Sequence, residues 1–338
     1  MRIHTVGIDI AKTVFHLVAV DEKGSVVVKK KFSRPQLLVY TANLQAEVIG
    51  MEACSGAHFL TRALIAQGHN VKLMPAEYVR PYVKSNKNDF IDAEAIAEAV
   101  LRPNMRFVPL KTEEQLDLQA LHRVRERWIG RKVALTNQLR GFLLERGLPI
   151  RVGSEHLRKA LPSILEDAEN GLTPRARTIL STLREEWTEL ETRIDTVTDE
   201  IGRISRSNEG CKRLMGVPGI GPIISTALVA AVGNATAFKK GRDMASWLGL
   251  VPRQHSSGGK TKLLGISKRG NFYIRKLMVE GARAAFARLN RSQHSFGPWM
   301  DNLQSGKHSN VAVVALANKM ARIAWAVLTT GQQYRAAT

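Results

Sequence analysis

Short apolar segments dominate the first hundred residues. Residues 3–10, 13–20 and 25–32 each fit a β-strand, and the turns between them are short. Further along, the spacing of apolar residues predicts alternating helices and strands, namely a helix after Pro35, a strand at 47–53, a helix at 56–67, a strand at 70–74 and a helix from Asn88 to Leu101. This order predicts an α/β domain in which helices flank a mixed sheet.

The middle of the chain has a helical repeat instead. One long helical pattern runs from 112 to 145 with many arginines, and a second runs from 174 to 205. In the second, apolar residues recur at alternating steps of four and three: Leu183, Trp187, Leu190, Ile194, Val197, Ile201 and Ile204. A period of 3.5 predicts a coiled coil. Residues 147–173 link the two helices. The helices either form an antiparallel hairpin within one chain or pair with the helices of another subunit.

The last part of the chain is predicted to be mostly helical. Its helical segments are 272–290 and 309–330, and a loop rich in Gly, Ser and Lys fills 253–271. The apolar stretch 311–330 contains Lys319 and Arg322, so we predict a buried helix and not a membrane span. The sequence therefore predicts three parts, an α/β domain at 1–110, a coiled-coil region at 111–208 and a basic domain at 209–338.

The positive charge is concentrated at one end of the chain. Of the net charge of +20, residues 211–338 carry +16, from 19 Lys and Arg against 3 Asp and Glu. Residues 1–110 carry 14 against 10, and residues 111–210 carry 17 against 17. Such a field attracts a polyanion, and we find no amphipathic basic helix or lipidation signal, so nucleic acid is the predicted partner rather than a membrane.

Cysteine usage and the N-terminus indicate where the protein works. Cys54 and Cys211 are the only cysteines, and their spacing fits neither a disulfide framework nor a zinc site. The first apolar run is interrupted by Asp9 and Lys12, which is unlike a signal peptide. A cytoplasmic protein is expected.

Four carboxylates are candidates for chemistry. Asp9 lies at the end of the first strand among apolar neighbours, where a charge is costly unless a cation neutralises it. Glu52 ends the fourth strand, and Asp89 and Asp92 share one face of a helix start. Together they predict a divalent-metal site that acts on phosphates. Separately, Asp92 is explained as a helix-start acid and Glu52 as the partner of an arginine.

Two C-terminal segments are candidates for nucleic-acid contact. GVPGIGP resembles a helix–hairpin–helix, in which Gly219 and Gly221 let the backbone approach a phosphate, although a tight turn without a ligand has the same sequence. The stretch RQHSSGGKTKLLGISKRGN has two adjacent hydroxyls and five basic residues, and its composition favours a solvated loop that contacts phosphate. A serine nucleophile needs an activating group, and no base is identified there. The cations of this loop are Lys260, Lys262, Lys268 and Arg269.

These segments resemble the DEDD-type insertion-sequence transposases. Asp9 in VGIDIAK, Glu52 in GMEACSG and the two aspartates of KNDFIDAEAIAEA match the four acids of that family's motif. The segment MGVPGIGP…FKKGRDMASWLGLVPRQHSSGGKTKLLGISKRGN resembles the family's second domain, so the resemblance covers nearly the whole chain. It implies an RNase H-like (RuvC-like) N-terminal domain, and three strands followed by alternating helices and strands is the order of that fold.

The resemblance also implies a mechanism and partners. The four acids are expected to bind Mg²⁺ or Mn²⁺. A serine is expected to attack DNA and form a phosphoserine intermediate, and by motif position it is Ser257, before Gly258, with Ser256 as the rival. Members of the family use a structured guide RNA from the element to select DNA. They act as homo-oligomers, so we expect a dimer or tetramer on DNA in a bacterial, nucleoid-associated protein.

Three alternatives stay open at this stage. A metal-only nuclease or Holliday-junction resolvase uses water and forms no covalent adduct. An ATP-dependent, sugar-kinase-like protein is suggested by GIDIAKT, although no second glycine-rich phosphate loop is present. A non-catalytic DNA-binding protein would rely on the glycine hairpin alone.

Overall fold

The chain folds into two compact units, Met1–Thr112 and Glu113–Thr338. The structure is a computed structural model, and it describes residues 2–84 and 88–335. The first unit is α/β and the second is mostly helical, which confirms the two fold classes predicted for the ends of the chain. The finer division of the chain into three parts stays a prediction.

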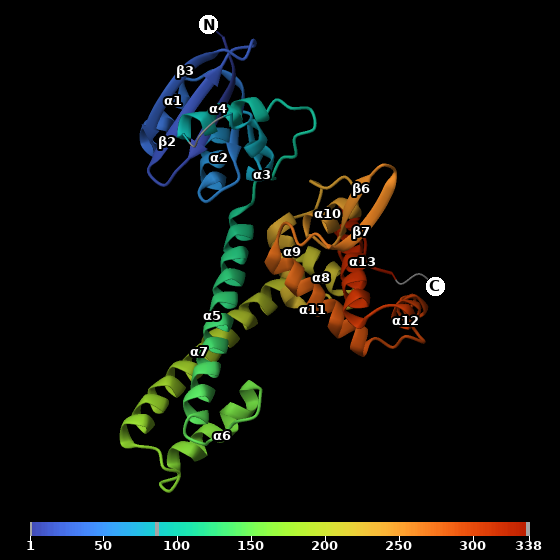
Figure 1. Cartoon of the computed structure of the whole chain (residues 1–338). Helices are drawn as coiled ribbons and strands as arrows, with labels where there is room; N and C mark the ends of the chain where they lie inside the picture. Colours follow the sequence, from blue (N-terminus) through green and yellow to red (C-terminus); the bar gives the residue numbers. More distant parts are fainter. Residues whose placement is uncertain (1, 85–87, 336–338) are drawn as a thin grey trace. The chain divides into compact units, whose positions relative to one another are not determined.

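A five-stranded mixed sheet organises the first unit (Figure 1). The strand order is β3-β2-β1-β4-β5, with β2 antiparallel to both β1 and β3, and with β4 parallel to both β1 and β5. The strands are β1 (Ile3–Ile10), β2 (Val14–Val20), β3 (Val26–Ser33), β4 (Ala46–Glu52) and β5 (Val71–Met74).

Helices cover both faces of this sheet. One core cluster joins the even-numbered residues of β1, such as Ile8, to α1 and α2 through Leu37 and Leu60. The opposite face packs on α4, where Val18 of β2 meets Ala93. The helical elements of the unit are α1 (Arg34–Ala42), α2 (Ala57–Ala66), α3 (Ala76–Val79), the 3₁₀ turn η1 (Arg80–Tyr82) and α4 (Asp89–Ala99).

Two long helices pair within the second unit. In α5 (Glu113–Leu144) and α7 (Pro174–Ser207), Arg125 Nε donates to Thr198 Oγ1 at 2.8 Å and Trp187 Nε1 donates to Thr136 Oγ1 at 2.9 Å. The partners run in opposite chain directions, so the helices are antiparallel and pair inside one chain. Every apolar position of the 3.5-residue repeat predicted in α7 is buried or half-buried.

The link between the two long helices contains a helix that the sequence pattern did not predict. α6 (Ser154–Glu166) buries Leu157 and Leu161 in the same cluster as Leu139 of α5. Its interior Pro162 and the glycines around it made the segment look irregular. Packing of its two leucines against the helix pair is what stabilises it.

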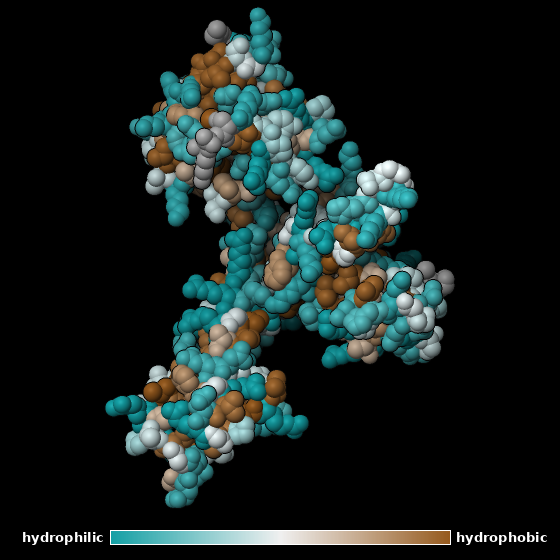
Figure 2. Space-filling model, viewed as in Figure 1, coloured by the Kyte–Doolittle hydropathy of each residue, from teal (hydrophilic) through white to brown (hydrophobic). Residues whose placement is uncertain are grey.

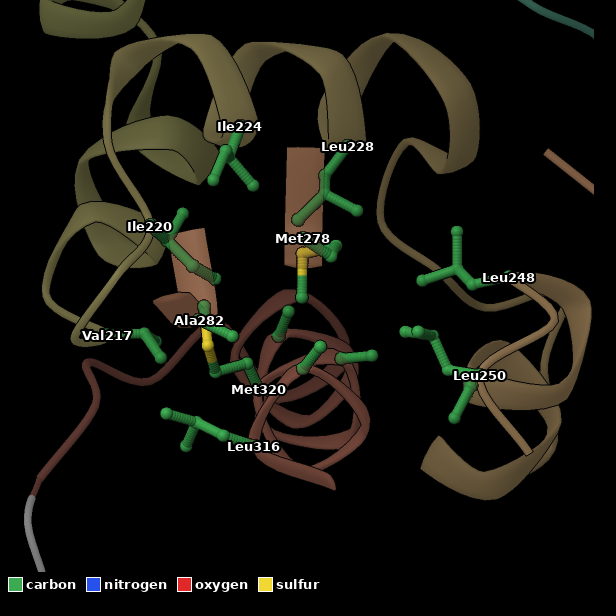
Figure 3. Packing of buried hydrophobic residues seen from close by; sticks show 14 of the residues in the cluster. Val217, Ile220, Ile224, Leu228, Leu248, Leu250, Met278, Ala282, Leu316 and Met320 are labelled. Carbon is green, nitrogen blue, oxygen red and sulfur yellow. The ribbon is translucent and has the colours of Figure 1, made fainter. Parts of the chain in front are cut away.

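The remaining helices of the second unit surround one apolar core. Ile224 and Leu228 of α9, Met278 of α11, and Leu316 and Met320 of α13 point toward one another (Figure 3). The elements are α8 (Glu209–Met215), α9 (Pro222–Val232), α10 (Gly241–Trp247), β6 (Pro252–Ser257), β7 (Lys260–Ile266), α11 (Phe272–Arg288), α12 (Gly297–Gly306) and α13 (Ser309–Thr330).

α13 is the predicted apolar C-terminal helix. Among the described helices it alone has the length and composition of a membrane span, with 22 residues and a mean hydropathy of 1.6 over a window of 18 of them. Half of that window is buried inside the unit, including Leu316 and Met320, so α13 is a core helix as predicted.

Candidate active site

Two neighbouring strand ends and one helix start bring the four predicted acids together. In the parallel ladder Ile8 pairs with Met51, so Asp9 and Glu52 are the next residues on adjacent strands. Asp89 and Asp92 lie in the first turn of α4, whose N-cap Asn88 accepts a hydrogen bond from Phe90 N at 2.9 Å. The structure thus gathers at one edge of the sheet residues that lie far apart in the sequence.

Two glycines allow α4 to lie close to the sheet. Gly7 and Gly50 pair in the ladder, each two residues before an acid of the site. A Cβ on Gly7 would lie 2.0 Å from the carbonyl oxygen of Ala93, and one on Gly50 would lie 3.0 Å from Val100 Cβ and 3.2 Å from Ile96 Cγ2. The missing side chains let α4 hold Asp92 over the ends of β1 and β4.

The environment of the site disfavours ionised carboxylates. Burial raises the pKa of the Asp9 carboxyl, and the nearby Asp92 and Asp89 raise it further, while His16 and a backbone N–H oppose the shift. Burial, then Asp9 and Asp92, likewise raise the pKa of Glu52. Asp89 and Asp92 are therefore close enough to Asp9, and Asp9 and Asp92 close enough to Glu52, for their charges to oppose the ionisation of each.

His16 belongs to this site, although the sequence did not single it out. It pairs with Asp9 across the β1–β2 ladder, and its Nδ1 lies 3.6 Å from Asp89 Oδ2. Its ring meets the edge of Phe90 at a centroid distance of 4.7 Å, and Lys29 Nζ lies 4.9 Å from the centre of the same Phe90 ring. The only signal in the sequence was one polar residue in an otherwise apolar strand.

The donor set fits a divalent cation. Carboxylate oxygens are the ligands that Mg²⁺ and Mn²⁺ prefer, and a cation removes the repulsion that raises the pKa of Asp9 and of Glu52. Within the described residues, no three acidic, histidine or cysteine side chains are already spaced to hold a metal ion. The carboxylates converge without forming a preshaped cage.

The predicted serine loop is a β-hairpin. β6 and β7 are antiparallel, and the tight turn between them is made of Gly258 and Gly259, whose φ angles are 55° and 75°. Positive φ at both turn positions is typical of a type I′ turn. All six residues of β6 are exposed, so no apolar alternation marked the strand and the sequence suggested a loop.

The two serines at the hairpin tip have different surroundings. Ser256 Oγ accepts a hydrogen bond from Gln254 Nε2 at 2.6 Å and lies 3.3 Å from Thr261 Oγ1. Ser257 pairs with Lys260 beside the turn, and within the described residues its hydroxyl makes no hydrogen bond. The Ser257 hydroxyl is thus exposed and available.

A buried arginine secures the base of the hairpin. Arg275 Nη1 donates to the carbonyl oxygens of Leu248, at 3.0 Å, and Arg269, at 2.9 Å. Gly270 has a φ of 76°, and a Cβ there would lie 1.8 Å from the carbonyl oxygen of Trp247. This close approach fixes the segment that follows β7.

The four cations predicted to contact nucleic acid are all exposed. Lys260 and Lys262 lie on β7, and Lys268 and Arg269 lie on the segment that follows it. Lys268 has a φ of 55°, unusual for a residue with a side chain. These cations and both serines belong to the second unit, whereas the acids belong to the first.

The glycine turn before α9 has a packing role that the sequence did not reveal. A Cβ on Gly219 would lie 2.5 Å from the carbonyl oxygen of Gly281 in α11, so this glycine permits contact between the turn and that helix. Around Gly221 there is open space. That either glycine contacts a phosphate stays a prediction.

Two transposase families match the two parts of the chain that carry these features. A protein-family model described as "Transposase IS116/IS110/IS902 family" matches residues 211–297. A second, described as "Transposase" and named for DEDD transposases of the IS110 type, matches residues 6–146. The first match includes the hairpin and the second includes all four acids.

Relatives that match over nearly the whole chain are transposases as well. The transposase for insertion sequence element IS1111A of Coxiella burnetii is 41% identical over 98% of this chain and 92% of its own length. The transposase for insertion sequence element IS1328 of Yersinia enterocolitica is 41% identical over 96% of this chain and 97% of its own. A probable family 20 transposase of Pseudomonas aeruginosa is 40% identical over 99% of both chains. The chain therefore belongs to the IS110 family of insertion-sequence transposases, enzymes that cleave and join DNA.

Proposed function

We propose that this transposase exchanges DNA strands through a covalent intermediate on Ser257. The Ser257 Oγ forms a bond to phosphorus and a bridging P–O bond of the DNA breaks. The released deoxyribose oxygen gains a proton and the serine hydroxyl loses one. Rejoining reverses these steps with a hydroxyl from another strand. The free hydroxyl at the hairpin tip supports this assignment over Ser256, whose oxygen already accepts a hydrogen bond from Gln254.

The acidic site is proposed to bind Mg²⁺ or Mn²⁺. The observation that carries this proposal is the convergence of Asp9, Glu52 and Asp92, with Asp89 beside them, in an environment that raises the pKa of Asp9 and Glu52. When bound, the cation neutralises the carboxylates and polarises the scissile phosphate. The strand order of the N-terminal sheet supports an RNase H-like fold for this domain.

Nucleic acid and further copies of the chain are the proposed partners. The charge of +16 on residues 211–338 and the exposed Lys260, Lys262, Lys268 and Arg269 suit DNA and a structured guide RNA. Because acids and serine lie in different units, an oligomer on DNA can combine the acids of one copy with the serine of another. Sequencing of RNA that co-purifies with the protein tests the guide; recovery of only random cellular RNA would contradict it.

The test of the serine mechanism is adduct formation on DNA that carries element ends, with Mg²⁺ present. We expect wild type and Ser256→Ala to form an adduct that survives denaturing gel electrophoresis, and Ser257→Ala to form none. Asp9→Asn should also form none, because the scissile phosphate loses its metal. An adduct in both serine variants would overturn the assignment.

A metal-only reaction with water is the second candidate, because all four acids lie in one unit apart from the serine. It predicts that Ser257→Ala still cleaves the DNA while Asp9→Asn does not, and that neither wild type nor variant yields an adduct.

A further inference from the structure

A large groove lies in the second unit beside the root of the hairpin. Its volume is about 1180 Å³. The hairpin strands, the start of α10, one residue of α12 and one side of α13 form its walls.

The groove explains why α13 is apolar on both sides. Leu316 and Met320 face the core, whereas Val311, Val314 and Trp325 line the groove at helical spacing. Val311 is 53% exposed, whereas Val314 and Trp325 are half-buried and also contact the core, so the apolar surface that this face leaves open is centred on Val311. Figure 2 displays apolar residues where α13 lies below the hairpin, surrounded by hydrophilic ones.

The charges around the groove have one sign. The residues that line it include four cations, Lys240, Arg242, Lys319 and Arg322, and no acid. Acids are scarce throughout residues 211–338, which contain three, and one of these, Asp301, is paired with Arg291 at 2.7 Å. This complementarity favours a polyanion as the occupant over an ordinary protein segment.

Its apolar floor favours unpaired bases over a duplex. A duplex presents phosphates and grooves, which cations alone can bind, whereas exposed bases need flat apolar surface. Trp299 and Trp325 supply aromatic surface, and Lys319 Nζ lies 4.4 Å from the centre of the Trp299 ring. Cations interleaved with aromatic rings are typical of single-strand binding sites.

We propose that this groove binds a single-stranded stretch of DNA, with its bases on the apolar floor and its phosphates toward the four cations. The inference rests on the proposed function in one respect, that the strand is the one Ser257 attacks. From Leu264 at the groove to Lys260 at the turn, β7 advances four residues, about 14 Å in an extended strand. The groove would hold an unpaired strand near the scissile phosphate and so make strand opening favourable.

Substitution of Val311 by aspartate tests the groove in the full-length protein. Val133→Asp is the matched control. Val133 lies on α5, outside the groove, and is 55% exposed, and its substitution by aspartate changes the net charge by the same amount. The probes are a single-stranded DNA oligonucleotide containing 2-aminopurine, its duplex and the RNA of the same sequence. We expect Val311→Asp to weaken single-stranded DNA binding about tenfold relative to Val133→Asp, and to weaken the quenching of 2-aminopurine that stacking produces. Duplex binding should be equal in both variants.

Equal single-strand affinity in the two variants would overturn the proposal, and so would a loss confined to duplex. A loss for RNA that exceeds the loss for DNA would overturn the choice of DNA. The adduct assay separates this result from the serine mechanism. If wild type forms no adduct but Val311→Asp alone loses single-strand binding, the serine step is refuted and the groove proposal is supported. If wild type forms the adduct but Val311→Asp binds single strands as well as Val133→Asp does, only the groove proposal is refuted.

Discussion

At the scale of single residues, the site places acids where an uncompensated charge destabilises the fold. The sheet, the helix and the paired glycines hold Asp9, Glu52 and Asp92 together, and burial and mutual repulsion raise the pKa of Asp9 and Glu52. In each case the unfolded chain releases the proton at a lower pH than the folded one, so this contribution to stability is lost as pH rises from the ordinary pKa through the raised pKa of the folded chain. A bound cation offsets that cost.

Asp9→Asn should therefore separate stability from activity. Without divalent metal at neutral pH, we expect the variant to melt at a higher temperature than wild type, because the repelling charge is gone. Saturating Mg²⁺ should stabilise wild type, by about 2.7 kcal/mol at a hundred times Kd, and stabilise the variant much less. Thermal unfolding with and without Mg²⁺ measures both effects. Asp199→Asn, an exposed change on α7, should respond to Mg²⁺ like wild type. Equal metal stabilisation of Asp9→Asn and wild type would contradict the site.

At the scale of elements, α4 lies close to the sheet because Gly7 and Gly50, which face it, have no side chains. A Cβ on Gly7 would meet the backbone of α4 at 2.0 Å, whereas a Cβ on Gly50 would meet the side chains of Ile96 and of the C-cap Val100 first, and the carbonyl oxygen of Ile96 at 3.3 Å. The two contacts differ in what can move, because a side chain yields more readily than a backbone. Gly50 is thus the position where α4 can be displaced without loss of the fold.

Gly50→Ala should shift α4 slightly and weaken metal binding. The new methyl group would lie 3.0 Å from Val100 Cβ and 3.2 Å from Ile96 Cγ2, so we expect a loss of about 1–3 kcal/mol in the free energy of unfolding, as in overpacked cores. Because α4 carries Asp92, the affinity for Mg²⁺, measured by calorimetry, should fall as well. Gly130→Ala in α5 meets no atom within 4 Å and should be neutral or stabilising. Unchanged metal affinity in a destabilised Gly50→Ala would reject this role for α4.

A buried histidine gives the second unit a dependence on pH. His122 of α5 is 3% exposed, and its ring nitrogens lie 2.9 Å from Tyr273 Oη and 3.0 Å from Thr226 Oγ1. Burial, and then the nearby Arg125, lower the pKa of His122 to about 4. Below pH 6.5 the unfolded chain takes up a proton that the folded chain refuses, so stability falls from pH 6.5 down to about pH 4.

Chemical denaturation as a function of pH tests this histidine. Across that window the second unit should lose up to about 3 kcal/mol through His122, and His122→Gln should flatten the profile even if it lowers stability at pH 7. His156→Gln, on α6, is the control and should leave the profile unchanged. If His122→Gln still loses as much free energy of unfolding over this pH range as wild type does, other groups cause the effect.

Sequence periodicity predicted the elements whose apolar faces are regular and missed those held by other means. The strands of the N-terminal sheet, α4 with its Asn88 cap, and the long helices were all found. α6 has apolar residues at helical spacing, Leu157, Leu161 and Ile164, but its interior Pro162 and the flanking glycines obscured the helix. α12 is short, and β6–β7 is exposed along most of its length, so neither has a clear periodic pattern. For the site, acids in apolar surroundings were informative. His16 and the packing role of Gly219 depend on partners distant in the sequence, which no local pattern reveals.

At the scale of the whole molecule, the net positive charge is concentrated in the last part of the chain, because acids are scarce there. Residues 1–110 contain the four acids of the proposed metal site, and residues 211–338 carry +16. Phosphate contacts by the basic part would attract DNA whatever its sequence, because they release counterions whatever the bases are. Phosphate contacts alone therefore do not select particular DNA sites, and the proposed guide RNA would supply that selection.

The hairpin cations should account for a measurable share of that attraction. If Lys260 and Lys262 each contact one phosphate, the double variant Lys260→Ala/Lys262→Ala should reduce the slope of log K against log [salt] by about 2 for duplex DNA. Affinity at low salt should fall and the two proteins should converge at high salt, since the lost term is counterion release. Lys159→Ala is the control, because Lys159 on α6 already pairs with Glu155 at 3.5 Å, and its slope should match wild type. Binding isotherms at several salt concentrations measure the slopes. A double variant whose affinity falls with no change in slope would mean that the hairpin contributes shape, not phosphate contacts, to DNA binding.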